Sequence, residues 1–452
     1  MKRLRLSLAV CVCKLAILTS RLLGKKGTSM PGHLAFKIYP GVLKDLASQV
    51  KREIIVSTGT NGKTTTNNLL YSYLTGSGNR VVGNLVGANM FYGICCAFCE
   101  KANIFGKLDA DFACLEVDEA STVKVLSHIK PHKMIITNLF RDQMDRYGEI
   151  EMTVDYIKRA LNQSPDTELI LNGDDPIVAQ FGEDKSRKSY YVCVDEDTGA
   201  GDNSAKEGQF CMICGAKLDY EYHHYSQLGK FSCSGCGFKR EKPDFKINSV
   251  SITDGLKFDI SYNGEVIPFD VNYRGFYNVY NIAMSYAAAR LSYGEIPCYG
   301  EILASYRPQI GRMEEFNIAK SVVLNLAKNP AGFNQAIQTV MQDEKKKDIL
   351  LAVNDNESDG IDISWFYDVD FEKLSSDEVG RIIVSGFRSD DLALRLKYAG
   401  ISPERIIKAY DLKDAAKKLL TGSGEICYAL VNYTVVFRMQ EILKEMEAAQ
   451  SE

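Results

Sequence analysis

The sequence predicts an α/β protein with a large α/β unit that has a mostly parallel sheet, a cysteine-rich insertion in that unit, and a smaller α/β unit. Three observations support this prediction. Apolar runs that end abruptly in polar residues alternate with helix-like segments, as buried parallel strands and their crossover helices do. A polar, glycine-dotted stretch with paired cysteines interrupts this pattern between residues 197 and 242. At 452 residues, the chain also exceeds the size of one hydrophobic core.

The amino-terminal residues, MKRLRLSLAVCVCKLAILTSRLLGKKG, look at first like a signal peptide. Lys14 and Arg21 interrupt the apolar run, so the segment is too broken for a signal peptide or a bilayer span. We expect a basic amphipathic helix within a lead-in segment, residues 1–45. In the interpretation we favour, this helix packs on the first unit, and the alternative is a helix that also contacts an anionic membrane surface. Its apolar residues recur at helical spacing: Leu4, Leu8, Cys11, Leu15, Leu18 and Leu22.

The first unit is expected over residues 46–315. Its predicted parallel strands are EIIVSTG, FACLEVDEA, KMIITNLF and ELILNGDDP. Helix-like segments such as TTTNNLLYSYL lie between them, with Leu69, Leu70, Tyr73 and Leu74 on one face. After the insertion, KINSVSITDGLKFDISYNGEVIPFDVNY alternates apolar and polar residues around two turns, as hairpin strands do. The predicted helix NVYNIAMSYAAARLSYG then closes the unit.

The second unit is expected over residues 316–452, a length typical of one domain. It repeats the α/β pattern on a smaller scale, so we expect a Rossmann-like arrangement. The segments that carry the pattern are SVVLNLAKNP, KDILLAVNDNESDG, RIIVSGFRSDDLALRLKYAG and EICYALVNYTVVFRMQEIL.

The composition narrows the class of protein. The 54 basic residues nearly balance the 58 acidic residues, and the resulting net charge of -4 gives no electrostatic footprint for nucleic acid. Thirteen cysteines are spread through the large chain, and their number is odd. This usage favours reduced thiols in the cytoplasm over the disulfide framework of a secreted protein.

The stretch STGTNGKTTT, which begins at Ser57, has the features of a phosphate-binding loop. A predicted strand leads into Gly59 and Gly62, and a helix is expected to begin at about Lys63. Glycines let the backbone approach a phosphate closely, and the helix start attracts negative charge. Lys63 would neutralise the β- and γ-phosphates, and the Thr64 hydroxyl would bind magnesium. The alternative is a tight glycine turn that only caps the helix, but the position after a buried strand favours a phosphate-binding loop.

The loop resembles the ATP loop of the Mur ligase superfamily, and four further elements follow in the order of that family. They are LEVDEAS, TNLFRDQMD, GFYNVYN and IGRMEEF. The resemblance implies a Mur-ligase-like central domain in which Thr58, Gly59, Thr60, Asn61, Gly62, Lys63, Thr64 and Thr65 bind ATP. It also implies that Glu116 holds magnesium, that Asn281 faces the adenine and that Arg312 contacts a phosphate. A surface salt bridge is the alternative role for Glu116.

The sequence departs from the family pattern at three places. Only 56 residues precede Ser57, so we expect the domain that binds uridine nucleotides in other members to be missing. Gln143 stands where the family has a histidine, and NLAKNP at residues 325–330 replaces a conserved element of the carboxyl-terminal domain. These changes indicate a different acceptor amine. Lys328, within NLAKNP, is a candidate for a position near the reacting carboxylate.

These departures, the four-cysteine insertion at residues 205–242 and the carboxyl-terminal stretch DNESDGIDISWFYDVDFE resemble one branch of the superfamily, the synthetase subunits of lipid II isoglutaminyl synthase. The resemblance implies ATP-dependent amidation of D-isoglutamate in the stem peptide of lipid II, with ammonia from a glutaminase of the GatD type in a heterodimer. It also implies that Asp355 completes the catalytic triad of that partner, whereas an Asx turn or a helix cap is the alternative role. Asn356, Asp359, Gly360, Asp362 and Trp365 are expected to shape the interface loop.

Cys211, Cys214, Cys233 and Cys236 form two C-x-x-C pairs, each followed by glycine. Four thiolates on two such turns complete a tetrahedron, so the pattern predicts a structural zinc ribbon at residues 205–242. Reduced thiols and an iron–sulfur cluster are the alternatives. His223 and His224 lie between the pairs, where we expect exposed or hairpin positions rather than zinc ligands.

Together these features and the resemblance predict a cytoplasmic ligase that uses ATP and magnesium and binds no nucleic acid. The resemblance implies lipid II or a related precursor as its substrate, and contact with the inner face of the membrane stays an open alternative. Two other functions stay open. One is an amino-acid ligase of the folylpolyglutamate synthase kind, which would share the loop. The other is a scaffold that binds ATP without turnover.

Overall fold

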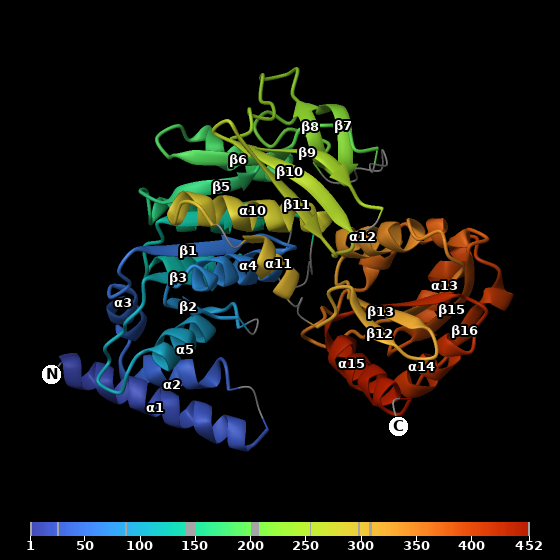
Figure 1. Ribbon diagram of the computed structural model, residues 1–452, viewed down its shortest axis with the longest axis horizontal. Helices are drawn as coiled ribbons and strands as arrows, with labels where there is room; N and C mark the ends of the chain where they lie inside the picture. Colours follow the sequence, from blue (N-terminus) through green and yellow to red (C-terminus); the bar gives the residue numbers. More distant parts are fainter. Residues whose placement is uncertain are drawn as a thin grey trace.

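The computed structural model describes residues 2–24, 27–85, 88–141, 150–199, 208–253, 255–296, 299–306 and 310–450. These residues form two sheets with helices on both faces and a small two-stranded sheet (Figure 1). Within these ranges, no helix is long and apolar enough to cross a membrane.

The first sheet has nine strands in the described part of the chain, and its central strands are parallel. Only the last two strands, which form hairpins after the insertion, run antiparallel to their neighbours, so the prediction of a mostly parallel sheet is confirmed. In spatial order the strands are β11 (Glu265–Val271), β10 (Leu256–Tyr262), β9 (Phe245–Ser251), β6 (Ser189–Val194), β5 (Glu168–Asn172), β4 (Lys133–Ile136), β1 (Glu53–Thr58), β3 (Phe112–Glu116) and β2 (Val81–Gly83).

Helices cover both faces of this sheet because its strands are apolar on both sides. Ile54 and Val56 of β1 face one core and Ile55 faces the other, as the alternation of side chains along a strand requires. The first face is covered by α2 (Met30–Ile38), α3 (Val42–Ala47), α5 (Phe91–Lys101), α6 (Thr122–Leu126) and α8 (Ile150–Asn162). The second face is covered by α4 (Lys63–Gly76), α10 (Tyr277–Ser292) and α11 (Tyr299–Ser305).

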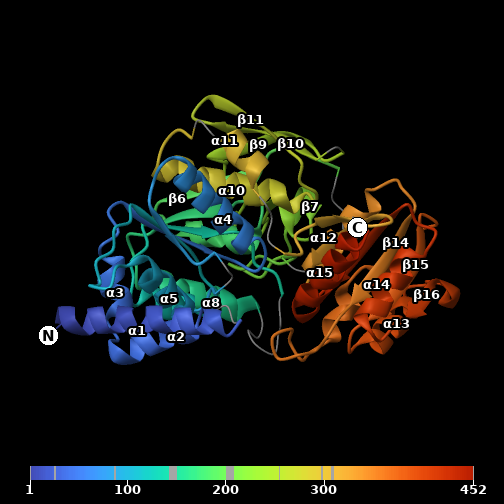
Figure 2. The same ribbon diagram turned by 60° about the horizontal axis from the view of Figure 1, so that its bottom comes forward.

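The predicted amino-terminal helix is present as α1 (Lys2–Leu22), and it packs on α2 and α5 as an outer layer (Figure 2). It packs through a different set of residues from the predicted stripe: Leu6, Ala9, Val10, Cys13 and Ile17. The predicted stripe of leucines faces solvent instead. One helix therefore carries two apolar faces, and tertiary packing uses only one of them.

The insertion forms the hairpin of β7 (Asp219–Tyr225) and β8 (Leu228–Ser232) next to the short helix α9 (Pro176–Ala179) and the 3₁₀ turn η1 (Gln180–Glu183). His223 and His224 lie in β7, as expected for hairpin residues. His224 is fully buried against Phe276 and Tyr280, so it is a core side chain and not an exposed one.

The second sheet has six strands in the described residues, and all neighbours except β12 and β13 are parallel. Two helices pack on each face, with η2 (Ser364–Asp368), η3 (Phe371–Ser375) and η4 (Pro403–Arg405) as short 3₁₀ turns. The strands in order are β12 (Glu314–Asn317), β13 (Ser321–Leu326), β17 (Ile426–Val431), β14 (Lys347–Ala352), β15 (Val379–Ser385) and β16 (Ile406–Lys408). The helices are α12 (Pro330–Met341) and α13 (Ser389–Tyr398) on one face, and α14 (Leu412–Leu420) and α15 (Tyr433–Ala448) on the other.

Candidate active site

The glycine loop connects β1 directly to α4, and its two glycines have positive φ angles of 122° at Gly59 and 84° at Gly62. L-residues with a side chain rarely adopt this backbone conformation. A Cβ atom on Gly59 would also come within 2.7 Å of the Asn138 carbonyl oxygen, and one on Gly62 would collide with the Asn281 side chain. The loop conformation therefore requires glycine at both positions.

The carboxyl end of β4 braces this loop. The Asn61 backbone N–H donates to Asn138 Oδ1 at 2.8 Å, and Asn138 Nδ2 donates back to the Asn61 carbonyl at 3.0 Å. The Thr137 hydroxyl donates to the same carbonyl at 2.7 Å. These bonds explain why TNLF accompanies the loop in the sequence. Gln143, the departure predicted to change the acceptor, lies outside the described residues.

Lys63 is buried at the start of α4, where its Nζ lies 2.8 Å from Glu119 Oε1 and donates to the Gly59 and Thr60 carbonyls. Burial lowers the pKa of Lys63, but the charges of Glu119, Asp118 and Glu116 outweigh burial and raise that pKa above its usual value. Burial raises the pKa of Glu119, and the charge of Lys63 opposes this shift. The ammonium group is therefore charged and held in place before any phosphate arrives.

Glu116 is the last residue of β3, and only one of its two carboxylate oxygens has a hydrogen-bond partner among the described residues. Its Oε1 accepts a hydrogen bond from Asn89 Nδ2 at 2.9 Å. Its Oε2 is buried and has no hydrogen-bond partner among the described residues. A buried carboxylate oxygen without a partner is costly, and a cation is the group that would satisfy it. Glu116 is thus not the surface salt bridge that we considered as its alternative role.

A cavity of about 740 Å³ opens between the carboxyl edge of the first sheet and the second sheet. Its walls bring together predicted residues that are far apart in the sequence: Thr60, Asn61, Gly62, Lys63, Thr64, Thr65, Glu116, Asn281, Arg312 and Lys328. Its volume is in the range of pockets that hold small ligands. The remaining loop residues, Thr58 and Gly59, are not among the lining residues, and Thr58 is buried at the end of β1.

Several lining residues were missed by sequence reasoning: Asp118, Glu119, Asn138, Tyr277, Glu314, Asn325 and Gln440. A signal for Asp118 and Glu119 is present, because they stand in the polar end of the predicted run FACLEVDEA, two and three residues after Glu116. Gln440 had no such signal. It lies inside α15, and only the packing of α15 beside the cavity shows that it is near the glycine loop.

Asp355 does not line this cavity. It follows β14, and its partly exposed carboxylate lies 3.6 Å from Arg388. The same loop contributes Ser358 to the cavity wall. Asp359 fixes the loop, because its Oδ1 accepts the backbone N–H of Thr434 at 2.9 Å. The loop therefore connects the cavity with an outer surface.

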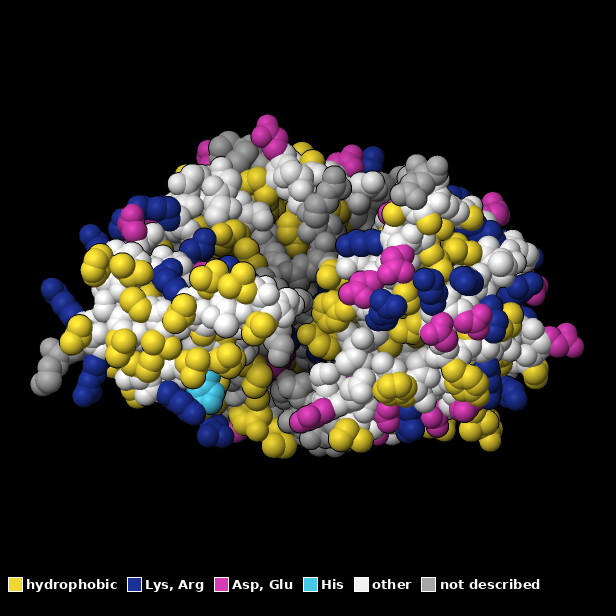
Figure 3. Space-filling view, turned by 90° about the horizontal axis from the view of Figure 1, so that it is seen from below, with side chains coloured by type: hydrophobic (Ala, Val, Ile, Leu, Met, Phe, Trp, Pro, Cys, Tyr) yellow, Lys and Arg dark blue, Asp and Glu magenta, His cyan; other side chains and the backbone are white. Residues whose placement is uncertain are grey.

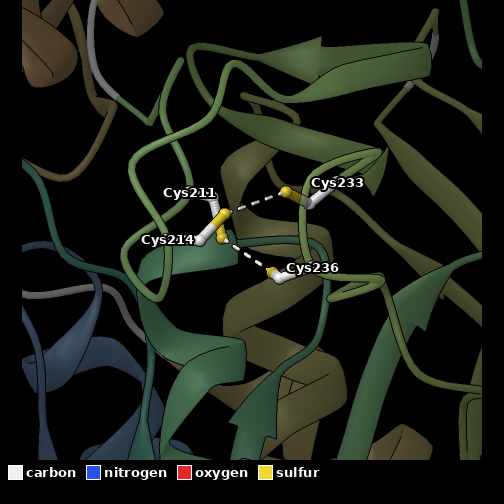
Figure 4. Close-up of side chains that lie close together, drawn as sticks. All are labelled: Cys211, Cys214, Cys233 and Cys236. Carbon is white, nitrogen blue, oxygen red and sulfur yellow. Dashed lines mark hydrogen bonds between the residues drawn. The ribbon is translucent and has the colours of Figure 1, made fainter.

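The four predicted metal-binding cysteines converge, with sulfur atoms within 4.8 Å of one another (Figure 4). Cys211 Sγ lies 3.6 Å from Cys236 Sγ, and Cys214 Sγ lies 3.5 Å from Cys233 Sγ. Tetrahedral zinc with Zn–S bonds of about 2.3 Å places its sulfurs roughly 3.8 Å apart. Despite some desolvation, hydrogen bonds from the backbone of Cys236 and from Cys214 lower the pKa of Cys233 to about 7. The cluster fits a zinc ion, and the histidines between the pairs are not part of it.

The arrangement is that of a Mur ligase. Residues 58–211 match the Mur ligase middle domain family, and residues 326–436 match the MurT ligase C-terminal family. The fold is similar to that of a pseudomurein peptide ligase type C from Methanothermus fervidus, with a TM-score of 0.68 and 24% identity over 88% of this chain and 79% of that chain. It is also similar to MurF from Thermotoga maritima in complex with ADP, with a TM-score of 0.65 and 13% identity over 92% of this chain and 85% of that chain.

Relatives of known name show to which group of Mur ligases the chain is similar in sequence. The chain is 37% identical to the MurT subunit of lipid II isoglutaminyl synthase (glutamine-hydrolyzing) of Staphylococcus aureus strain N315, over 98% of this chain and 99% of that protein. It is 32% identical to the MurT subunit of Streptococcus pneumoniae strain ATCC BAA-255 / R6, over 94% of each chain. The chain belongs to the MurT family. This membership confirms the resemblance found in the sequence and the prediction of an ATP-dependent ligase.

Proposed function

We propose that this chain amidates the α-carboxylate of D-isoglutamate in the stem peptide of lipid II, and that it uses ATP and ammonia from a glutaminase subunit of the GatD type. The observation that carries the proposal is the cavity in which Lys63, Glu116 and Arg312 meet, in a chain 37% identical to a MurT subunit. A carboxylate is a poor electrophile, so it must first accept the γ-phosphoryl group before ammonia can displace phosphate. We infer that this reaction takes place in the cytoplasm at the inner face of the membrane.

The chain supplies the groups that phosphoryl transfer needs. Loop residues 60–62 and the start of α4 line the cavity where we place the phosphates, and Lys63 supplies a fixed positive charge there. Arg312 approaches from the segment that leads into the second sheet, so both sheets must be in place to surround the nucleotide. Asn281 contacts the glycine turn and is assigned to the adenine.

Magnesium fits beside Glu116 because the Oε2 oxygen has no other partner among the described residues. The Thr64 hydroxyl, which also lines the cavity, would complete the protein ligands. Magnesium bound there would neutralise charge on the transferring phosphoryl group. Glu119 holds Lys63 in the same wall, and the charge of Lys328 acts on Glu119 from the second sheet. We assign Lys328 to the part of the cavity near Glu119, and we place the activation of the substrate carboxylate there.

Asp355 is assigned to the partner. A carboxylate at the end of a strand can orient a histidine of another chain by accepting its ring N–H. Arg388 Nε lies 3.6 Å from Asp355 Oδ2. A histidine of a docked partner would therefore compete with Arg388 for the Asp355 carboxylate. Since the loop of Asp355 also supplies Ser358 to the cavity, a glutaminase on this surface would release ammonia one loop away from the site of amidation.

Co-expression with a candidate glutaminase, followed by mass spectrometry of the muropeptides, tests the proposal through the small mass decrease from acid to amide. Asp355→Asn should abolish the product made from glutamine and spare the product made from free ammonium. Asp414→Asn is the matched control, because this exposed carboxylate lies on α14, outside the loop of Asp355, and pairs with Lys418 of its own helix. Equal loss with both nitrogen sources would refute the role of Asp355. Incorporation of glutamate instead of ammonia would identify an amino-acid ligase, and intact amidation in Lys63→Ala would identify a scaffold.

A further inference from the structure

The outer helix α1 exposes a second apolar stripe that no described residue covers. The exposed fractions are 75% for Leu4, 54% for Leu8, 64% for Leu15, 56% for Leu18 and 79% for Leu22. These residues recur every three or four positions, so they lie on one side of the helix, opposite the residues that pack on α2 and α5. Exposed leucines scattered singly need no explanation, but a stripe along the whole helix does.

Neighbouring segments widen this stripe. The loop after α5 exposes Ile104 and Phe105, by 52% and 75%. It is tied to α1 because the Ser7 hydroxyl donates to the Ile104 carbonyl at 2.7 Å. The space-filling view shows apolar side chains gathered over α1 and α2, with basic groups around them (Figure 3). We call the five leucines of α1 together with Ile104 and Phe105 the outer apolar face.

The charge around the outer apolar face is entirely of one sign in the first part of the chain. Residues 1–44 contain nine lysines and arginines and no aspartate or glutamate, although the whole chain carries a net charge of -4. Arg3, Lys14 and Arg21 are spaced eleven and seven residues apart, so they share one flank of the stripe. Arg21 pairs with Glu100, and Arg3 is exposed. An apolar stripe with basic flanks matches an anionic lipid surface, into which leucines insert while lysines and arginines contact headgroups.

We propose that the outer apolar face docks this chain on the anionic surface of a phospholipid bilayer, with α1 lying in the plane of the interface. The helix does not span the bilayer, since no described helix is long and apolar enough. The position suits a lipid-linked substrate. Helix α5 follows Asn89 and Met90, which line the cavity, and carries in its last turn Glu100, which contacts α1. Its eleven residues span roughly 16 Å.

Only the role of the docking rests on the proposed function: the docked helix would hold the cavity near a membrane-bound substrate. The binding itself follows from the outer apolar face alone. A second copy of the chain or another protein could also cover leucines, but neither explains why residues 1–44 carry nine basic residues and no acidic residue. Anionic lipid explains both the leucines and the charge.

Flotation with lipid vesicles tests the docking directly, with the full chain alone and with its partner subunit. Vesicles of phosphatidylcholine alone are compared with vesicles that also contain phosphatidylglycerol. The wild-type chain should float with the anionic vesicles, and added salt should weaken this binding. The triple variant Leu8→Gln, Leu15→Gln, Leu18→Gln should bind at least tenfold more weakly. Leu394→Gln is the matched control, because Leu394 is 50% exposed on α13, outside the outer apolar face. This variant should bind the vesicles like the wild type.

Three outcomes would overturn the proposal. They are absence of the wild-type chain from anionic vesicles, equal binding of the triple variant, and a wild-type dimer that the triple variant converts to monomer without any vesicle binding. Amidation of a water-soluble stem-peptide substrate with free ammonium is measured in parallel, and the triple variant should retain this activity. Vesicle binding without amidation would refute the proposed function and leave the docking intact, whereas amidation without vesicle binding would refute only the docking.

Discussion

Replacing Gly62 by alanine tests whether the glycine loop seats the nucleotide. Gly62 has a φ angle of 84°, and the new Cβ would collide with the side chain of Asn281. The left-handed backbone costs an alanine about 1–2 kcal/mol. Moving Asn281 breaks its 3.0 Å hydrogen bond to Asn278, which costs about 1 kcal/mol more.

We expect the free protein to relax the loop, so that most of this cost appears when nucleotide binding restores it. A total of about 2–3 kcal/mol corresponds to a Kd for ATP that is roughly 30- to 150-fold higher. Calorimetric titration with a non-hydrolysable ATP analogue measures this change. Gly78→Ala is the matched control, because Gly78 has a φ angle of 82° and its added Cβ would meet no atom within 4 Å. Equal affinity of Gly62→Ala and Gly78→Ala for the analogue would refute the assignment of the loop to ATP.

Three further predictions follow from single sites. Asn89→Ala removes the hydrogen bond that orients Glu116, so the magnesium concentration for half-maximal ammonium-driven amidation should rise roughly 10- to 100-fold; an unchanged magnesium dependence would contradict the metal assignment. Cys211→Ser should lower both the zinc content measured by mass spectrometry and the melting temperature, and a full zinc content would contradict the ribbon. Burial raises the pKa of Asp175 from 3.8 to about 7, so the folded state holds the proton of this carboxyl more tightly than the unfolded state does. The stability that protonated Asp175 contributes is therefore complete below about pH 3.8 and is lost as the pH rises through 7. The melting temperature of Asp175→Asn relative to the wild type should therefore rise between pH 4 and pH 8, and a constant difference would contradict this pKa.

The sequence predicted the first sheet because its signals are local. Runs such as EIIVSTG have the apolar pattern of buried parallel strands, and the glycines after them mark the turn into α4. The same holds for the hairpins of β9 to β11, where alternation and turn residues coincide. In each case neighbouring residues carry the information, and the structure agrees.

Tertiary structure decided which of several equivalent patterns is used. In α1, two apolar stripes satisfy helical periodicity, and only the contact with α2 and α5 selects Leu6, Val10 and Cys13 for the core. His224 has no sequence signal for burial, yet Phe276 and Tyr280 enclose it. Gln440 enters the cavity wall only because α15 packs beside the segment of Arg312.

The sequence by itself thus determined the class of fold, the glycine loop and the four cysteines, since each depends on residues within a few positions of one another. Only the tertiary structure decided that Lys63 is held by Glu119, that Glu116 has an unpartnered oxygen, and which side of α1 faces outward. These features arise from contacts between segments distant in the chain, where burial and charge depend on what the fold places opposite each side chain.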